Sequence, residues 1–201
     1  MYRYILSFIF LLGLSSGLIN AEGLKSGPWF NQYVSGVNRE PARATSYSFE
    51  TVADAVTCNR DAAKMVSLNG VWKFDFAEDI CKAPMDFYQE GFDVSSWGDI
   101  KVPSCWDVQG FGYPIYINTR YPFPYNPPYI DRPNPIGSYV RTFSVPSSWE
   151  GGRVILHFGG VYSGHQVWVN GHEVGYSEDS CLPSEFDITD YLKSGDNTLS
   201  V

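Results

Sequence analysis

The sequence is short of positive charge, of histidine and of long hydrophobic runs. Its 201 residues include 14 Lys and Arg against 22 Asp and Glu, a formal net charge of −8, and no run of basic residues. Because phosphate groups are bound by clustered Lys and Arg, this balance argues against nucleic acid or an anionic membrane as a partner. The histidines His157, His165 and His172 are not spaced as partners for a cysteine-based zinc site, and we expect His165 and His172 to be surface or hairpin residues.

Cysteine is also scarce, and its spacing is uninformative. Cys58, Cys81, Cys105 and Cys181 form no C-x-x-C pair. Four cysteines allow three disulfide pairings, and buried free thiols are an equal alternative. The sequence also lacks a phosphate-cradling glycine loop, a serine nucleophile elbow, βαβ alternation and heptad repeats, so the enzyme classes built on those motifs are not indicated.

The one long apolar run lies at the amino terminus. Arg3 precedes an apolar stretch from Ile5 to Leu14, and Ala21 offers a small residue for cleavage. This pattern predicts a secretory signal peptide over residues 1–21, with an uncleaved membrane anchor as the alternative. No later segment is apolar enough to cross a bilayer, so we expect a secreted, periplasmic or extracellular chain with no membrane span in its mature form.

What the sequence has in quantity is aromatic residues, glycine and proline. Aromatics make up 16% of the chain, with 19 Gly and 13 Pro, which favours an all-β domain over a helical bundle. Residues 22–65 show no sustained period and are interpreted as an extended arm that lies on another surface. Residues 66–201 are predicted to form an antiparallel β-sandwich.

Several strands follow from period-two alternation. Residues 71–76 alternate as a half-buried strand does, "GDIKV" predicts a short strand ended by Pro103, and "GSYVRTFSVP" predicts another. The proline-dense segment 110–135 excludes helix and central strand, and is predicted to be a long ordered loop.

The carboxyl-terminal third predicts two further strands and then a hairpin. Its turn is Asn170-Gly171, a pair typical of a type I′ turn. The final "EFDITDYLKSGDNTLSV" is predicted to be a helical turn, a second turn and a strand that is truncated at Val201.

An acidic stretch, "GYSEDSCLPSEFDIT", contains Glu178, Asp179, Glu185 and Asp187 and no basic residue. Neighbours in an extended segment point to opposite sides, so Glu178 and Asp179 make a poor catalytic pair. Glu185 and Asp187 could share a face, but no apolar pocket is indicated that would raise one pKa for general-acid chemistry. We expect these last two to be structural, satisfying backbone donors near the "FDIT" turn.

Several long motifs, which follow one another along the sequence in the expected order and spacing, resemble those of a known family. They are "VNREPARA", "SLNGVWKFDF", "PSCWDVQGFGYPIYINTRYPFPYNPPYI", "NPIGSYVRTFSVP" and "VWVNGHEVGYSEDSCLPSEFDITDYLKSGDNTLSV". Together they resemble the amino-terminal part of family 2 glycoside hydrolases, specifically the large bacterial lactose-type β-galactosidases. The resemblance implies a jelly-roll sugar-binding domain, followed in the family by immunoglobulin-like domains and a TIM barrel. That barrel carries the two glutamates of a retaining mechanism, which require a fixed separation of about 5 Å.

The same resemblance assigns two binding residues. Asn118, in "YINTRYP", matches an asparagine that hydrogen-bonds a galactose hydroxyl, and Asp179 matches an aspartate that binds galactose hydroxyls and ligates sodium. An amide and a carboxylate suit these tasks. Without the resemblance, Asn118 would be interpreted as a turn residue and Asp179 as a solvated loop acid. Cys181 stands where relatives often have a basic residue, so the resemblance does not define the contacts made there.

Other aromatic residues are interpreted as packing residues. Trp72, Phe74 and Trp168 lie on alternating strands and are predicted to belong to the core rather than to a sugar platform.

Three functions remain open at this point. The first is the amino-terminal portion of an exported, oligomeric β-galactosidase, with magnesium bound in the barrel outside this chain and no catalytic residue within it. The second is a stand-alone carbohydrate-binding module, and the third is an assembly scaffold. The unfinished last strand favours the first.

Overall fold

The computed structural model describes residues 27–201, apart from 116–117, 119–120, 128 and 131–133. The predicted signal peptide lies outside the described residues. The strands of the described part are β1 (Gly36–Val37), β2 (Gly70–Ala77), β3 (Gly98–Val102), β4 (Ile136–Ser144), β5 (Ile155–Phe158), β6 (Gly164–Val169), β7 (His172–Glu178), β8 (Ser184–Asp187) and β9 (Asp196–Ser200). Its helical elements are short: α2 (Val52–Val56) and the 3₁₀ turns η1 (Pro28–Phe30), η2 (Arg60–Ala62), η3 (Ile80–Lys82), η4 (Asp107–Gln109), η5 (Ser147–Trp149) and η6 (Thr189–Tyr191).

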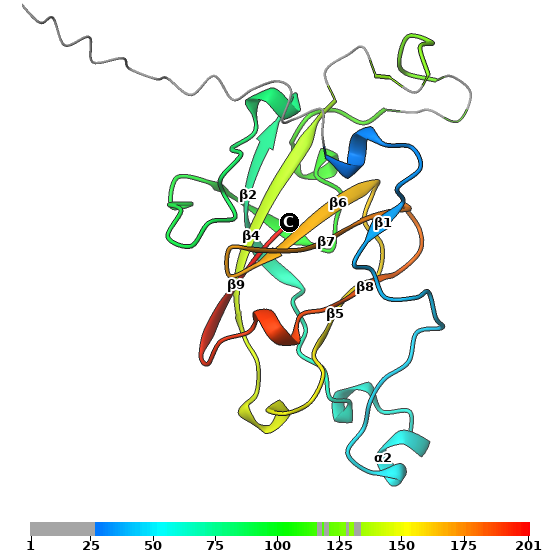
Figure 1. Cartoon of the computed structure of the whole chain (residues 1–201), viewed down its shortest axis with the longest axis vertical. Helices are drawn as coiled ribbons and strands as arrows, with labels where there is room; N and C mark the ends of the chain where they lie inside the picture. Colours follow the sequence, from blue (N-terminus) through cyan, green and yellow to red (C-terminus); the bar gives the residue numbers. More distant parts are fainter. Residues whose placement is uncertain (1–26, 116–117, 119–120, 128, 131–133) are drawn as a thin grey trace, which may run out of the picture.

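The strands form two antiparallel sheets of very unequal size. The large sheet has the order β1-β7-β6-β9-β4-β2-β3, and β5 pairs with β8 in a two-stranded sheet (Figure 1). Antiparallel strands with few helices confirm the predicted all-β class and are consistent with a sandwich. The finer jelly-roll assignment stays a prediction.

The core lies where the small sheet packs on the large one. Trp72 and Phe74 of β2 are 5% and 1% exposed, as predicted for core residues. They belong to one cluster with Leu156 of β5 and Phe186 of β8. The two sheets are therefore joined by a shared apolar layer, which supplies the main stabilisation of such a fold.

Trp168 was predicted to be a core residue and is only half-buried. It alternates with the buried Val167 and Val169 on β6, so its side chain leaves the opposite face of the strand. There its ring stacks on Tyr88 at a centroid distance of 4.9 Å and meets the edge of Phe87. Trp168 is thus a packing residue, but of a separate aromatic cluster.

The predicted hairpin turn is confirmed. Asn170 and Gly171 have φ angles of 51° and 81°, the positive pair that a type I′ turn requires. Unlike the residues of most hairpin tips, Asn170 is buried at 6% exposed, and Gly171 is half-buried. The Asn170 side-chain Nδ2 donates to the Tyr191 carbonyl (2.8 Å) and to Asn197 Oδ1 (2.7 Å). The Asn170 Oδ1 accepts from the backbone amide of Thr198 (2.9 Å).

One strand was missed. The segment "EFD", predicted to start a helical turn, lies in strand β8, which pairs with β5 through Leu156–Phe186 and His157–Glu185. The helical turn begins later, at Thr189, and is followed by the predicted strand β9. The strand is only four residues long and runs straight into η6, so its alternation is too brief to stand out.

Residues 35–43 of the arm lie on β7 and β8 of the same chain. Strand β1 pairs with β7, and the Glu40 amide donates to the Glu185 carbonyl (2.8 Å). Asn38 Nδ2 donates to the Val174 carbonyl (3.1 Å). Because β1 is the outer neighbour of β7, this short segment covers an edge that would otherwise expose unpaired backbone groups.

The cysteines correct a prediction. Cys58, Cys81, Cys105 and Cys181 are all exposed and free, so neither the disulfide nor the buried-thiol alternative holds in this structure. Within the described ranges, no helix is both long and apolar enough to cross a bilayer.

His165 also corrects a prediction, whereas His172 is exposed as expected. His165 is 7% exposed, and its ring lies against Phe158 and Phe186. Its Nε2 meets Ser184 Oγ at 3.0 Å, and its Nδ1 has no partner among the described residues. Burial, and then the positive charge of Arg39, lowers the pKa of His165 from 6.5 to about 4.

Gly175 is required by the close approach of the arm. A Cβ at this position of β7 would lie 2.4 Å from the Val37 carbonyl oxygen and 2.8 Å from a ring carbon of Phe186. We expect Gly175→Ala to lower the free energy of unfolding by about 1–3 kcal/mol, the usual cost of overpacking. Urea denaturation measures this. Gly159→Ala, where a Cβ meets nothing within 4 Å, is the control, and equal stability of the two variants would contradict the prediction.

Acid should destabilise the fold through His165. Between its pKa of about 4 when folded and its ordinary value of 6.5, the unfolded state binds the extra proton. The free energy of unfolding therefore falls as the pH drops from 6.5 towards 4, by roughly 3 kcal/mol once His165 is fully protonated in the folded state as well. We expect His165→Gln to flatten this part of the stability curve, measured by denaturation across that pH range, and the exposed His172→Gln to leave it unchanged. A slope that persists in His165→Gln would show that other groups cause it.

Candidate functional site

The four acids of the stretch from Glu178 to Asp187 lie in different surroundings. Glu185, on β8, accepts from Arg43 Nε (2.8 Å) and Nη2 (3.0 Å), and its Oε1 lies 2.9 Å from His157 Nδ1. Its side chain is 12% exposed. Its carboxylate is thus occupied by an arginine of the arm and by a neighbour on β5, which fits the predicted structural role.

Asp187 also has a structural role, and here the prediction of a backbone donor is confirmed. Its Oδ1 accepts from the Thr189 amide (3.0 Å) and hydroxyl, and its Oδ2 accepts from Arg153 Nε (2.7 Å). The bonds from Thr189, then the Arg153 charge, hold the pKa of Asp187 below its ordinary value. Arg153 also pairs with Glu40 of the arm at 2.8 Å. A carboxyl held ionised in this way is unsuited to general-acid chemistry.

Glu178 ends β7 and is held at both its backbone and its side chain. Its amide donates to the Ser35 carbonyl (3.0 Å), and its Oε1 accepts from the Tyr176 hydroxyl (2.6 Å). Burial, followed by the adjacent Glu178 carboxylate, raises the pKa of Tyr176. Residues 176 and 178 share one face of the strand, so alternation places this pair and turns Asp179 elsewhere.

Asp179 is the first residue after β7 and is exposed. Its φ of 111° lies in a region that residues with a Cβ rarely adopt. Its Oδ1 accepts from the backbone amides of Cys181 (3.2 Å) and Leu182 (3.4 Å), which closes the loop on itself. Among the described residues Oδ2 has no recorded partner, so one carboxylate oxygen is available for a hydroxyl or a cation.

Asn118 is exposed and lies in the segment 110–135. The described residues of that segment form turns and bends without helix or strand after η4, as the prolines predict. Figure 1 shows the segment at one end of the molecule, beyond the end of β2 and the start of β4. Asn118 and Asp179 therefore come from separate loops, one preceding β4 and one following β7.

The residues around Asp179 were not predicted as part of a site. Tyr176 and Ser177 are among the last residues of β7 and contact Glu178, and Arg39 reaches Ser177 and Glu178 from the distant arm. The only signal for Arg39 was its position within the motif "VNREPARA", because pairing across more than a hundred residues leaves no periodic trace.

The donor set for a cation is incomplete in this chain. In the part of the chain that the structure describes, no three His, Cys, Asp or Glu side chains gather as a metal site. Asp179 Oδ2 fits as one oxygen ligand for a hard cation such as sodium. Its other ligands would have to be backbone or amide oxygens, or come from elsewhere in the protein.

A family model accounts for most of the chain. Residues 65–201 match the model described as glycosyl hydrolases family 2, sugar binding domain. The chain therefore belongs to the family 2 glycosyl hydrolases, and these residues form the family's sugar-binding domain.

Curated relatives make the likeness more specific. The chain is 42% identical over 177 residues to a β-galactosidase of Priestia megaterium, covering 85% of this chain and 17% of that protein. It is 39% identical to a β-galactosidase of Psychromonas ingrahamii (90% and 17%) and 38% identical to the β-galactosidase large subunit of Leuconostoc lactis (82% and 29%). The chain thus spans less than a third of the length of each of these relatives.

Solved structures support the fold. A β-glycosidase from Bacteroides vulgatus is similar with a TM-score of 0.50 and 26% identity over 67% of this chain and 16% of that one. A β-glucuronidase from Ruminococcus gnavus gives a TM-score of 0.50 at 19% identity, over 80% and 22%. The second likeness concerns the fold alone.

Proposed function

We propose that this chain is the sugar-binding portion of a retaining β-galactosidase that releases terminal, non-reducing β-D-galactose. The observation that carries the proposal is the identity of about 40% to β-galactosidases over most of this chain. The site supports it chemically, because the acidic stretch leaves one carboxylate, Asp179, with an oxygen available to a ligand.

Asp179 and Asn118 are proposed to bind galactose hydroxyls. A carboxylate accepts from hydroxyl groups, whereas an amide both donates and accepts, so the two together can select the orientation of hydroxyls on a sugar ring. A ring held at two points from two loops is also oriented for attack elsewhere. The exposure of both residues suits a site that another domain completes.

The catalytic carboxylates are proposed to lie outside this chain, in a barrel. A retaining mechanism needs one carboxylic acid that can donate a proton and one nucleophilic carboxylate about 5 Å from it. Glu185 and Asp187 are tied to arginines, and Glu178 accepts from a tyrosine hydroxyl. These three carboxylates are thus engaged in bonds within this chain rather than presented to a substrate.

The proposal extends to the bound ions, the cellular compartment and the oligomeric state of the complete protein. Sodium would take Asp179 as one ligand, and magnesium would be bound by the barrel. The signal peptide would export the protein to the periplasm or beyond, where it would act as a homo-oligomer on β-galactosides.

The isolated chain should be inactive. We expect purified residues 22–201 to give no hydrolysis of a nitrophenyl β-galactoside above buffer, with the complete protein from the same gene as the positive control. Hydrolysis by the isolated chain that is lost in Glu185→Gln would place catalysis in this chain and contradict the proposal.

In the complete protein, the two binding residues should affect substrate binding more than stability. A hydrogen bond to a charged group is worth about 1.5–3 kcal/mol, so Asp179→Ala should raise KM about 10- to 100-fold, and Asn118→Ala less. Steady-state kinetics and thermal unfolding of each variant test this.

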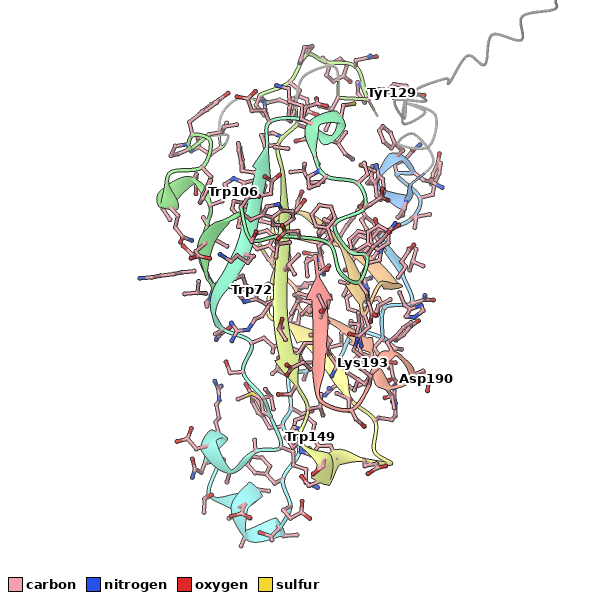
Figure 2. All side chains as sticks on the ribbon, turned by 90° about the vertical axis from the view of Figure 1, so that its left-hand side faces the viewer. Trp72, Trp106, Tyr129, Trp149, Asp190 and Lys193 are labelled. Atoms are coloured by element: carbon pink, nitrogen blue, oxygen red, sulfur yellow. The ribbon has the colours of Figure 1, made fainter. Side chains whose placement is uncertain are left out.

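The matched control is Asp190→Ala, an exposed acid on η6 that Figure 2 shows far from Tyr129, which marks the segment containing Asn118. Wild-type KM in both Asp179→Ala and Asn118→Ala would show that these residues do not bind the sugar. A stand-alone module would instead bind galactose without any activity in the complete protein.

A further inference from the structure

We propose that Arg39, in the amino-terminal arm, is a positioning residue that orients Asp179 for the sugar. This inference rests on the proposed function, since it assigns Asp179 a ligand. The new element is Arg39, about 140 positions from Asp179 in sequence, which holds the peptide unit between Glu178 and Asp179.

The key atom is the carbonyl oxygen of Glu178. It accepts from Arg39 Nη1 (3.2 Å) and from Ser177 Oγ (3.2 Å). This carbonyl belongs to the same planar peptide unit as the amide nitrogen of Asp179. Bonds that fix the plane of this unit therefore fix the direction from which the φ rotation of Asp179 starts.

The conformation at Asp179 requires such support. A non-glycine residue with a φ of 111° is strained by about 1–3 kcal/mol, and such residues persist only where the surroundings hold them. The two amides that bond to its Oδ1 come from the loop itself. Arg39 and Ser177 supply the bonds that connect this loop to the body of the sheet.

The arm delivers Arg39 to this place. Pairing of Gly36 with Ser177 and of Val37 with Tyr176 sets the register of the arm on β7. Asn38 then turns the chain with a φ of 52°. The Arg39 side chain folds back over Gly36, where a Cβ would lie 3.1 Å from Arg39 Nε.

The second contact of Arg39 anchors it in the sheet. Its Nη1 lies 3.0 Å from the hydroxyl of Ser177, which is 1% exposed. Arg39 itself is exposed and contributes little apolar burial. Its loss should therefore disturb the Asp179 loop more than the stability of the fold.

The arm offers a matched control. Arg43 has the same charge and lies four residues away, but in the described part of the chain its hydrogen bonds go to Glu185 of β8 and to Ser46, and none goes to β7. A general effect of arm charge would appear in both arginines, whereas a positioning effect would appear only in Arg39.

The experiment compares Arg39→Ala, Arg39→Lys, Arg43→Ala, Asp179→Ala and the Arg39→Ala/Asp179→Ala double variant in the complete protein, with a nitrophenyl β-galactoside as the probe. We expect Arg39→Ala to raise KM about 5- to 20-fold with little change in kcat, because uniform binding is lost. Arg39→Lys should recover part of this loss, Arg43→Ala should stay within about twofold of wild type, and the double variant should match Asp179→Ala.

A second measurement does not depend on activity. Hydrogen exchange at the Cys181 and Leu182 amides, which bond to Asp179, should be faster in Arg39→Ala than in wild type or Arg43→Ala. This measurement also reports on the loop if kinetics are lost through partial unfolding.

The outcomes separate the two proposals. If Asp179→Ala leaves KM unchanged, the proposed sugar-binding role of Asp179 fails, and the positioning role of Arg39 fails with it. If Asp179→Ala raises KM but Arg39→Ala behaves like Arg43→Ala, only the positioning role is overturned. It is also overturned if the effects of Arg39→Ala and Asp179→Ala multiply in the double variant, or if exchange at the two amides is unaltered.

Discussion

The structure depends on the close backbone approach between the arm and β7. At Gly175 the missing side chain leaves room for the Val37 carbonyl, so that β1 can pair along the edge of the large sheet. This register also places the residues that follow β1, so that the Arg39 side chain reaches Ser177 and the Glu40 amide reaches the Glu185 carbonyl. The arm thereby covers an exposed sheet edge. It also brings the charged side chains of Arg39 to the end of β7, Arg43 to Glu185 of β8 and Glu40 to Arg153 before β5.

Those charges explain why an acidic stretch can be present without being a catalytic pair. Glu185 and Asp187 are neutralised by arginines from the arm and from the segment before β5. Their role is to connect elements far apart in sequence. In Asp179, only a few residues earlier, one carboxylate oxygen accepts hydrogen bonds from its own loop, and the other is available to a ligand. The stretch is thus divided between holding the sheets together and presenting one acceptor outwards.

The sequence predicted what has a local period and missed what depends on distant contacts. Alternation identified β2, β4 and the Asn170-Gly171 hairpin, because each is long enough to show its pattern. Strand β8 is too short for that, and the burial of His165 depends on the small sheet that β8 helps to form. Asn118 and Asp179 came from the resemblance alone, since neither spacing nor composition distinguishes them from ordinary loop residues.

The buried turn at Asn170 has a practical consequence. Hairpin tips are usually the places where a chain accepts an insertion, a tag or a protease cut. At this tip the buried Asn170 side chain connects η6 and β9 to the β6–β7 hairpin by hydrogen bonds. A label or spectroscopic probe is better placed at Gly159, an exposed residue directly after β5, where an added Cβ meets no described atom within 4 Å and the backbone needs no positive φ.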